Sequence, residues 1–159
     1  MNNATESTYT IRIATGGDLE DLLFLLEIMH GKAAKRNARD GEAELLQTIL
    51  KQPLRRLLVA EAVQGIVGTV DVLVVHNLSR NMAPWATVEN LSVDPTMRRR
   101  GIGRALMEEA EAYAQSYGCY KIQLISNDAR GPAHALYSGL GYNAHVTGFR
   151  KYLADVEHV

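Results

Sequence analysis

A short run of arginines and glycines has the residue types needed to hold a phosphate group. The run is Arg98-Arg99-Arg100-Gly101-Ile102-Gly103-Arg104, and it stands between a strand-like segment and a strongly amphipathic one. The first turn of a helix leaves backbone N–H groups unpaired at the positive end of the helix dipole, where phosphate binds readily. Gly101 and Gly103 would let a phosphate approach the backbone. Guanidinium groups suit phosphate oxygens and are supplied by Arg98, Arg99, Arg100 and Arg104.

A simpler interpretation of this run stays open, in which arginines decorate a helix start and the glycines serve only the turn. Two familiar nucleotide motifs are absent. A dinucleotide-binding fingerprint needs a third glycine where Leu106 stands. A P-loop needs Lys-Ser or Lys-Thr after its last glycine, and the run has neither. Any phosphate would therefore be held in another way.

Glu89 is the other residue whose type stands out from its surroundings. It lies in Val88-Glu89-Asn90-Leu91, in the middle of an apolar, strand-like segment. A charged residue at such a position is unusual unless it is paired or functional, so a structural ion pair and a catalytic carboxylate both remain open. Alternation along a strand places Glu89 on the same face as Leu91, unless a bulge changes the facing.

The elements that must position these residues follow from periodicity and from turn signals. Strands are predicted at Tyr9–Ile13, Leu57–Val63, Ile66–Val75, Trp85–Val93 and Tyr120–Ser126, and two short ones between Tyr142 and Leu153. Helices are predicted at Leu19–Met29, Gly41–Gln52, Ile102–Tyr117 and Pro132–Leu140. Alternating strands and helices in the second half imply parallel neighbours within a mixed sheet. The predicted fold class is α/β.

Length and composition favour one globular domain, residues 1–159 with a core of about 9–153. The chain has 159 residues, of which 47% are hydrophobic. The 17 Lys+Arg residues are balanced by 18 Asp+Glu, so the basic excess of a general nucleic-acid binder is missing. The start of the chain lacks a signal-peptide pattern, and no apolar run is long enough to span a membrane. We therefore expect a cytoplasmic protein with no nucleic-acid or membrane partner.

The cysteine and histidine content predicts neither a disulfide framework nor a metal site. Cys119 is the single cysteine, so it cannot close an internal disulfide, and no partner suggests a nucleophilic role for it. The five histidines show no metal-ligand spacing. Metal is not expected.

Two motifs together resemble those of the GCN5-related N-acetyltransferases, the GNAT family. The pyrophosphate signature of that family, [Q/R]-x-x-G-x-[G/A], is matched by Arg98-x-x-Gly101-x-Gly103. Its second signature, L-Y-x-x-x-G-[F/Y], is matched by the segment from Leu136 to Tyr142. Both stand in the expected order, and the order of elements fits from Ile11 to Leu153. The resemblance implies the GNAT fold, a mixed and mostly antiparallel sheet flanked by helices, and acetyl-coenzyme A as cosubstrate.

The resemblance also implies a role for individual residues. In the family the pantetheine arm hydrogen-bonds the strand that maps onto Leu91, Ser92 and Val93. Tyr137 matches the tyrosine that protonates the departing thiolate, and packing against the sheet is its structural alternative. Glu89 matches a glutamate that acts as base through ordered water. Arg130 stands where many members have asparagine, so it either reaches a cofactor phosphate or caps the loop, and Asn127 could supply the missing polar contact.

The expected reaction is acetyl transfer to a primary amine of a small molecule. A protein lysine or N-terminus as acceptor, and a non-catalytic acyl-coenzyme A binding domain, are the alternatives. A basic loop containing Lys32, Lys35, Arg36 and Arg39 could attract an anionic acceptor or be a solvated loop. The acceptor itself is not identified, and a homodimer is compatible with these expectations.

Overall fold

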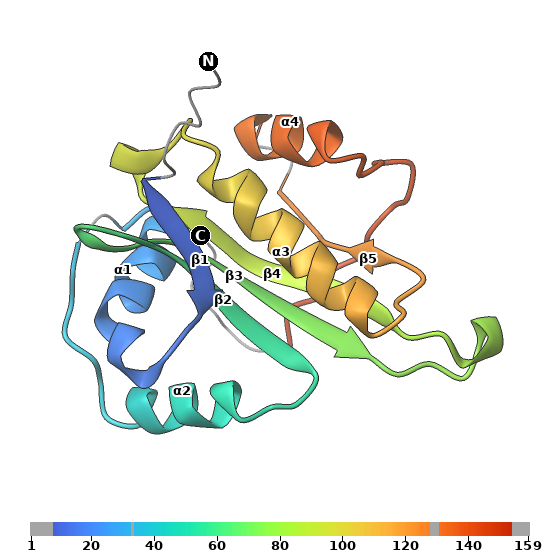
Figure 1. Ribbon diagram of the computed structural model, residues 1–159, viewed down its shortest axis with the longest axis horizontal. Coiled ribbons are helices and arrows are strands. Elements are labelled where there is room, and N and C mark those ends of the chain that lie inside the picture. Colours follow the sequence, from blue (N-terminus) through green and yellow to red (C-terminus); the bar gives the residue numbers. More distant parts are fainter. Residues whose placement is uncertain (1–7, 33, 128–130, 154–159) are drawn as a thin grey trace, which may run out of the picture. The chain divides into compact units, whose positions relative to one another are not determined.

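The computed structural model describes residues 8–32, 34–127 and 131–153. It divides into two compact units, Met1–Gln123 and Leu124–Val159. The first unit is built on a five-stranded sheet in which the strands follow one another in chain order (Figure 1). The strands are β1 (Tyr9–Ile13), β2 (Arg55–Ala62), β3 (Gly65–Val75), β4 (Trp85–Val93) and β5 (Ile122–Gln123).

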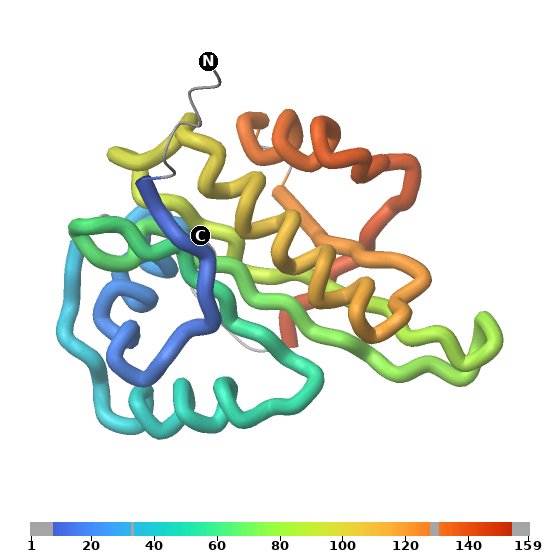
Figure 2. Tube along the Cα trace, in the orientation of Figure 1, coloured from blue at the N-terminus to red at the C-terminus, as the bar shows by residue number. Residues whose placement is uncertain are grey.

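The sheet is mixed and mostly antiparallel, as predicted. β1 to β4 pair antiparallel with their neighbours, and only β4 and β5 run parallel. The helices are α1 (Leu19–Met29), α2 (Glu42–Leu50), α3 (Ile102–Ser116) and α4 (Gly131–Gly139), and short 3₁₀ turns occur at Gly16–Asp18, Arg80–Met82 and Pro95–Met97. The tube in Figure 2 follows the chain from β4 through α3 back to β5, the crossover that makes this last pair parallel. In the described ranges, no helix has the length and apolar character needed to cross a bilayer.

The two faces of the sheet are covered by different helices. One core cluster joins Val59 of β2 with Leu25 of α1 and Leu46 of α2. The next residue of β2, Ala60, points the other way and lies opposite Gly68 of β3. A side chain at Gly68 would meet Ile102 of α3 at 2.9 Å, so the glycine lets α3 approach the sheet closely.

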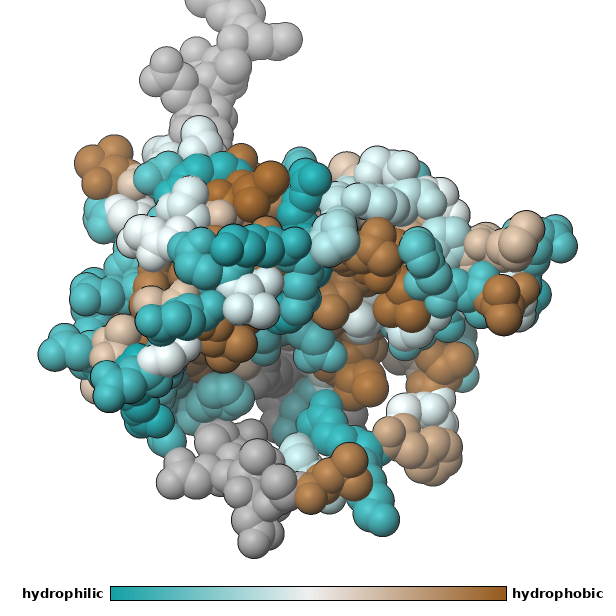
Figure 3. All heavy atoms as spheres, turned by 90° about the horizontal axis from the view of Figure 1, so that it is seen from below, coloured by the Kyte–Doolittle hydropathy of each residue, from teal (hydrophilic) through white to brown (hydrophobic). Residues whose placement is uncertain are grey.

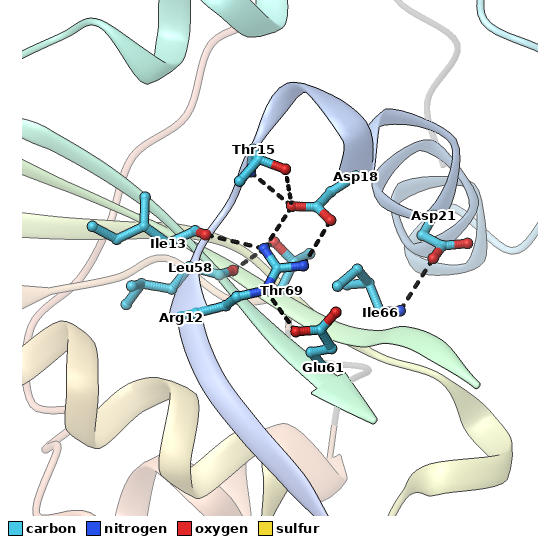
Figure 4. A network of polar contacts seen from close by, with 9 residues as sticks. All are labelled: Arg12, Ile13, Thr15, Asp18, Asp21, Leu58, Glu61, Ile66 and Thr69. Atoms are coloured by element: carbon cyan, nitrogen blue, oxygen red, sulfur yellow. Dashed lines mark hydrogen bonds and ion pairs between the residues drawn. The ribbon is translucent and has the colours of Figure 1, made fainter. Parts of the chain in front are cut away.

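A polar network ties the start of α1 to the sheet (Figure 4). Asp18 accepts from the Thr15 backbone N–H at 2.7 Å and from the guanidinium of Arg12 through both of its oxygens at 2.8 Å. Arg12 also donates to Glu61 of β2 at 2.8 Å. The hydrogen bonds from Arg12 and Thr15 lower the pKa of Asp18 against the opposing effect of burial. Thr15 and Asp18 thus form a capping box at the 3₁₀ turn that leads into α1.

The C-terminal strands predicted between Tyr142 and Leu153 are wrong for the described residues, where no strand follows α4. The apolar side chains that would have formed a buried face are instead exposed, with Val146 at 82% and Phe149 at 93%. A strand without a buried face gains little from apolar alternation. The predicted strand Tyr120–Ser126 is also shorter than expected, because β5 pairs only with Ala86 and Thr87 of β4.

Candidate active site

The glycine turn opens α3 as the sequence predicted. Gly101 is the N-cap residue at φ +82°, a conformation that favours glycine, and its carbonyl accepts from the Ala105 N–H at 3.0 Å. This is the first bond of the helix ladder, so the N–H groups of Ile102 and Gly103 find no acceptor within the helix. The Ile102 side chain is buried in the core, and only its backbone could face a ligand. The turn therefore has the backbone donors that a phosphate requires.

The arginines of the turn differ in what holds them. Arg98 folds back along the chain, and its Nε donates to the carbonyl of Val93 at 3.2 Å. Arg104 lies 3.7 Å from Glu108, one helical turn further on. Arg99 is exposed at φ +63°, and Arg100 is exposed as well. Arg98 thus links the end of β4 to the turn, and the guanidinium groups lie at the surface around the open helix end.

A bulge in β4 changes the facing expected for Glu89. Glu89 pairs with Asp71 of β3, and Ser92 pairs with Thr69, so two residues of β4 oppose one of β3 between them. Asn90 lies in this bulge at φ +57°. The residue in line with Glu89 is consequently Ser92, and the alternation that put Leu91 on the face of Glu89 is wrong.

The three strand residues expected at the pantetheine arm lie directly after the bulge. Ser92 is buried, and its hydroxyl donates to the Leu25 carbonyl of α1 at 2.7 Å. That side chain is therefore committed to the core. Leu91 and Val93 are half-buried at the end of the strand. The backbone of this segment could serve a ligand by strand-like hydrogen bonding.

A buried ion pair that the sequence reasoning missed lies beside Glu89. Asp71 stands directly opposite Glu89, so both side chains share one face of the sheet. Asp71 is 2% exposed and pairs with Arg55 of β2, whose Nε lies 3.0 Å from both carboxylate oxygens. Glu89, in contrast, is exposed. An aspartate flanked by Val70 and Val72 was the available signal, because a carboxylate between buried apolar residues needs a partner.

Tyr137 belongs to the second unit, where its motif forms the end of α4. The N–H of Tyr142 donates to the Tyr137 carbonyl at 3.0 Å, and that of Gly141 donates to the Ser138 carbonyl at 3.1 Å. Gly141 has φ +88°. These are the bonds of a Schellman cap, and the Tyr137 and Tyr142 rings lie 6.0 Å apart beside it. The spacing of the second motif is thus the spacing of a helix terminator. Asn127 is exposed in the same unit, and Arg130 lies outside the described residues.

Two of the basic residues in the loop after α1 form ion pairs with carboxylates of the protein itself. Arg36 donates to Glu27 of α1 at 3.0 Å and to both carboxylate oxygens of Glu42 of α2 at 2.7–2.8 Å. The Arg36 hydrogen bonds, with one from the Arg39 backbone, lower the pKa of Glu42 to about 2. Lys35 lies 3.6 Å from Asp21. A cavity of about 470 Å³ beside these groups is lined by Glu20, Lys35, Arg36 and Asn37. Its two cations have carboxylate partners, which weakens its attraction for an anionic acceptor.

Cys119, the possible metal ligands and Trp85 are the remaining side chains to place. Burial raises the pKa of the Cys119 thiol, which disfavours the thiolate that a nucleophile needs. Over the described ranges, no group of three or more His, Cys, Asp or Glu side chains is arranged to bind a metal ion. Trp85 begins β4, with the Lys121 ammonium 5.4 Å from its ring centroid.

Comparison with known proteins decides which family has this arrangement. A sequence profile of the acetyltransferase (GNAT) family matches residues 23–142, which include β4, the glycine turn, α3 and the Tyr137 motif. The chain belongs to this family. GNAT proteins use acetyl-coenzyme A as their cosubstrate, and the open helix end after β4 has the donors and the glycine that a pyrophosphate would need.

Individual relatives differ in their acceptors. Glucosamine 6-phosphate N-acetyltransferase of Trypanosoma brucei brucei is 32% identical over 85 residues, which are 54% of this chain and 56% of that one. The ribosomal protein bS18-alanine N-acetyltransferase of Salmonella typhimurium is 38% identical over 58 residues, covering 36% and 39% respectively. The chain thus spans about half or less of these curated relatives. A solved structure of a transcriptional regulator from Bacillus halodurans C-125 is 30% identical, covers 91% of this chain and 99% of its own, and has a TM-score of 0.83.

Proposed function

We propose that this protein transfers the acetyl group of acetyl-coenzyme A to a primary amine of a small molecule. The observation that carries the proposal is the left-handed Gly101 at the open start of α3, directly after a bulged β4. The backbone donors of this turn would hold the pyrophosphate, with charge added by Arg98, Arg99, Arg100 and Arg104. The backbone of Leu91–Val93 would accept the pantetheine arm, because the Ser92 side chain is occupied by Leu25.

The reaction requires two proton transfers. An ammonium has no free lone pair, so the acceptor must lose a proton before it attacks, and exposed Glu89 is the proposed base, acting through water. The amine nitrogen then bonds to the thioester carbonyl carbon, the carbon–sulfur bond breaks, and the sulfur leaves as a thiolate. Tyr137 is the proposed donor of the proton that this thiolate takes up. The products are an amide and free coenzyme A.

Two other functions have specific support. The Salmonella typhimurium relative is named as an alanine N-acetyltransferase of ribosomal protein bS18, which favours a protein acceptor. The Bacillus halodurans relative is a transcriptional regulator, which favours acyl-coenzyme A sensing without transfer. A small acceptor is preferred because the Trypanosoma brucei brucei enzyme, which matches a longer part of the chain, acts on an amino sugar phosphate.

Thiol release from acetyl-coenzyme A, measured against a panel of amino sugars, polyamines, aminoglycosides and N-terminal peptides, tests the proposal. We expect turnover with at least one small amine. With that acceptor, Tyr137→Phe should lower the single-turnover rate at least about tenfold, since acid–base assistance is worth about 10²–10⁴. Tyr142→Phe is the matched control, because it removes a hydroxyl from the ring that contacts Tyr137 and should leave the rate unchanged.

The outcomes separate the three functions. Coenzyme A binding without turnover on any amine would favour sensing. Turnover confined to peptides would favour a protein acceptor. An unchanged single-turnover rate in Tyr137→Phe would leave the transfer reaction standing but remove Tyr137 as its acid. Glu89→Gln should likewise lower turnover while leaving coenzyme A affinity unchanged in calorimetry, and a normal rate would mean that another group is the base.

A further inference from the structure

A second cavity in the first unit has the features of a binding site that the transfer reaction does not use. It encloses about 230 Å³ between the end of β1, the segment that joins α2 to β2, and α3. Tyr113 contributes to its wall, and this residue lies eleven positions after Ile102 in α3. At about 1.5 Å per residue, the cavity is roughly 16 Å along the helix from the glycine turn.

The charge around this cavity is positive. Lys51, Arg55 and Arg56 line it, and no carboxylate does. Arg55 is neutralised by buried Asp71. Lys51 is the C-cap residue of α2, where the negative end of the helix dipole offsets part of its charge. Arg56 is half-buried, and within the described ranges it forms no ion pair. The charge of Arg56 is therefore the one that lacks compensation.

Arg56 is held in a fixed position by an aromatic support. Its guanidinium carbon lies 4.5 Å from the centroid of the Tyr113 ring. The hydroxyls of Tyr113 and Tyr117 both donate to the Pro53 carbonyl, at 3.3 and 3.1 Å, so the ring is fixed in turn. Burial raises the pKa of Tyr113 to about 12, and its hydroxyl stays neutral near pH 7. A guanidinium stacked on a ring keeps its N–H edge available for a bidentate acceptor.

The other lining residues are Gln52, which is polar, and the apolar residues Ile13, Leu50, Pro53 and Leu57. Ile13 at the end of β1 is 48% exposed, although it belongs to a strand, and Leu50 and Leu57 line the same cavity. Figure 3 shows apolar side chains (brown) lying directly beside hydrophilic ones (teal) on one face of the molecule. An anion with an apolar body would satisfy both parts of the cavity. Its volume is below the roughly 300–1,000 Å³ usual for ligand sites, so the body must be small.

We propose that this cavity binds a small organic carboxylate, with its carboxylate on Arg56 and a short branched or aromatic body against Ile13 and Leu50. The two parallel N–H groups of a guanidinium match the two oxygens of a carboxylate. Of the three cations that line the cavity, Arg55 is paired with Asp71 and Lys51 is partly offset by the helix dipole, so there is no reason for a highly charged ligand such as a nucleotide. The proposal does not depend on acetyl transfer, because none of its residues is placed in the transfer site.

Benzoate is a suitable probe, and benzamide is its neutral counterpart of nearly the same shape. In methyl-resolved NMR of the full chain, benzoate should move the signals of Ile13, Leu50 and Leu57 with a Kd of about 1 mM or tighter. Benzamide should bind at least about tenfold more weakly. Arg56→Gln should weaken benzoate at least about tenfold. Arg80→Gln is the matched control, because the guanidinium carbon of Arg80 also lies over a tyrosine ring, 5.9 Å from the centroid of Tyr120. This substitution should leave the affinity for benzoate unchanged.

Three results would overturn the proposal. The first is equal affinity for benzoate and benzamide. The second is the same loss of benzoate affinity in Arg56→Gln and Arg80→Gln. The third is that the methyl signals do not move at a benzoate concentration about ten times the expected Kd. If Arg56→Gln fails to fold, Ile13→Asn tests the same cavity from its exposed apolar wall. That variant should also weaken benzoate, and unaltered binding to it would count against the site.

Discussion

The two ends of α3 allow the proposed pyrophosphate site at its start to be tested separately from protein stability. Gly101 precedes the helix at φ +82°, and Gly118 follows it at φ +72°. Alanine in the left-handed region costs about 1–2 kcal/mol, and the less flexible unfolded chain returns about 0.4–1 kcal/mol. Gly101→Ala and Gly118→Ala should therefore each lower the free energy of unfolding by about 1 kcal/mol. In a domain of this length that corresponds to a fall in Tm of about 2–4 °C.

Only one of the two substitutions should weaken the binding of coenzyme A. Near Gly118 the added methyl meets nothing within 4 Å, whereas at Gly101 it would stand 3.4 Å from the Tyr9 hydroxyl, at the open helix start. Calorimetric titration with coenzyme A should give a Kd at least about tenfold higher for Gly101→Ala, about 1.4 kcal/mol, and an unchanged Kd for Gly118→Ala. If both variants are folded and equally destabilised but bind coenzyme A equally well, the pyrophosphate does not bind at Gly101.

Three further predictions concern the framework of the first unit. Ser92→Ala should cost about 0.5–1.5 kcal/mol in urea unfolding, because the Leu25 carbonyl loses the Ser92 hydroxyl and keeps only its helical donor. A cost near zero would mean that this hydrogen bond adds nothing to stability. The folded pKa of Asp18 lies below its unfolded value, so the stability that Asp18 contributes is fully present above the unfolded pKa and is lost as pH falls through the folded pKa. In Arg12→Met, the free energy of unfolding should therefore fall less steeply with decreasing pH. If the fall is unchanged, other carboxylates cause it. NMR titration should give Glu42 a pKa of about 2 that returns towards 4.5 in Arg36→Gln, whereas an unaltered value would show that Arg36 is not its partner in solution.

The parts of the fold that follow from local pattern were predictable. β4 has both of its predicted ends, because alternating apolar residues stop at Asp94-Pro95. The end of α3 follows from Gly118, whose N–H donates to the Gln115 carbonyl at 2.9 Å in a left-handed cap. These features depend on neighbours in the chain, and such neighbours are visible in a sequence.

Features that depend on strand register were not predictable in the same way. The bulge at Asn90 requires a left-handed non-glycine residue, which hydrophobic alternation does not reveal. The pair of Arg55 with Asp71 joins two strands, and it becomes evident only once their register is known. The prediction of two strands between Tyr142 and Leu153 was wrong for a related reason. Alternation shows which residues could share a face, but it does not show whether a partner strand is present.

The cap at the end of α4 limits what a motif match can tell about catalysis. The interval from Tyr137 to Gly141 and Tyr142 is dictated by the two hydrogen bonds that terminate the helix, so any chain that ends a helix in this way meets the same spacing rule. A family member that had lost its chemistry but kept its architecture would retain the glycine and the interval. The pattern therefore carries information about backbone geometry, whereas the phenol oxygen of Tyr137 alone carries information about proton transfer. Classifying such chains as enzymes or sensors calls for kinetic comparison of variants that differ by that one oxygen atom.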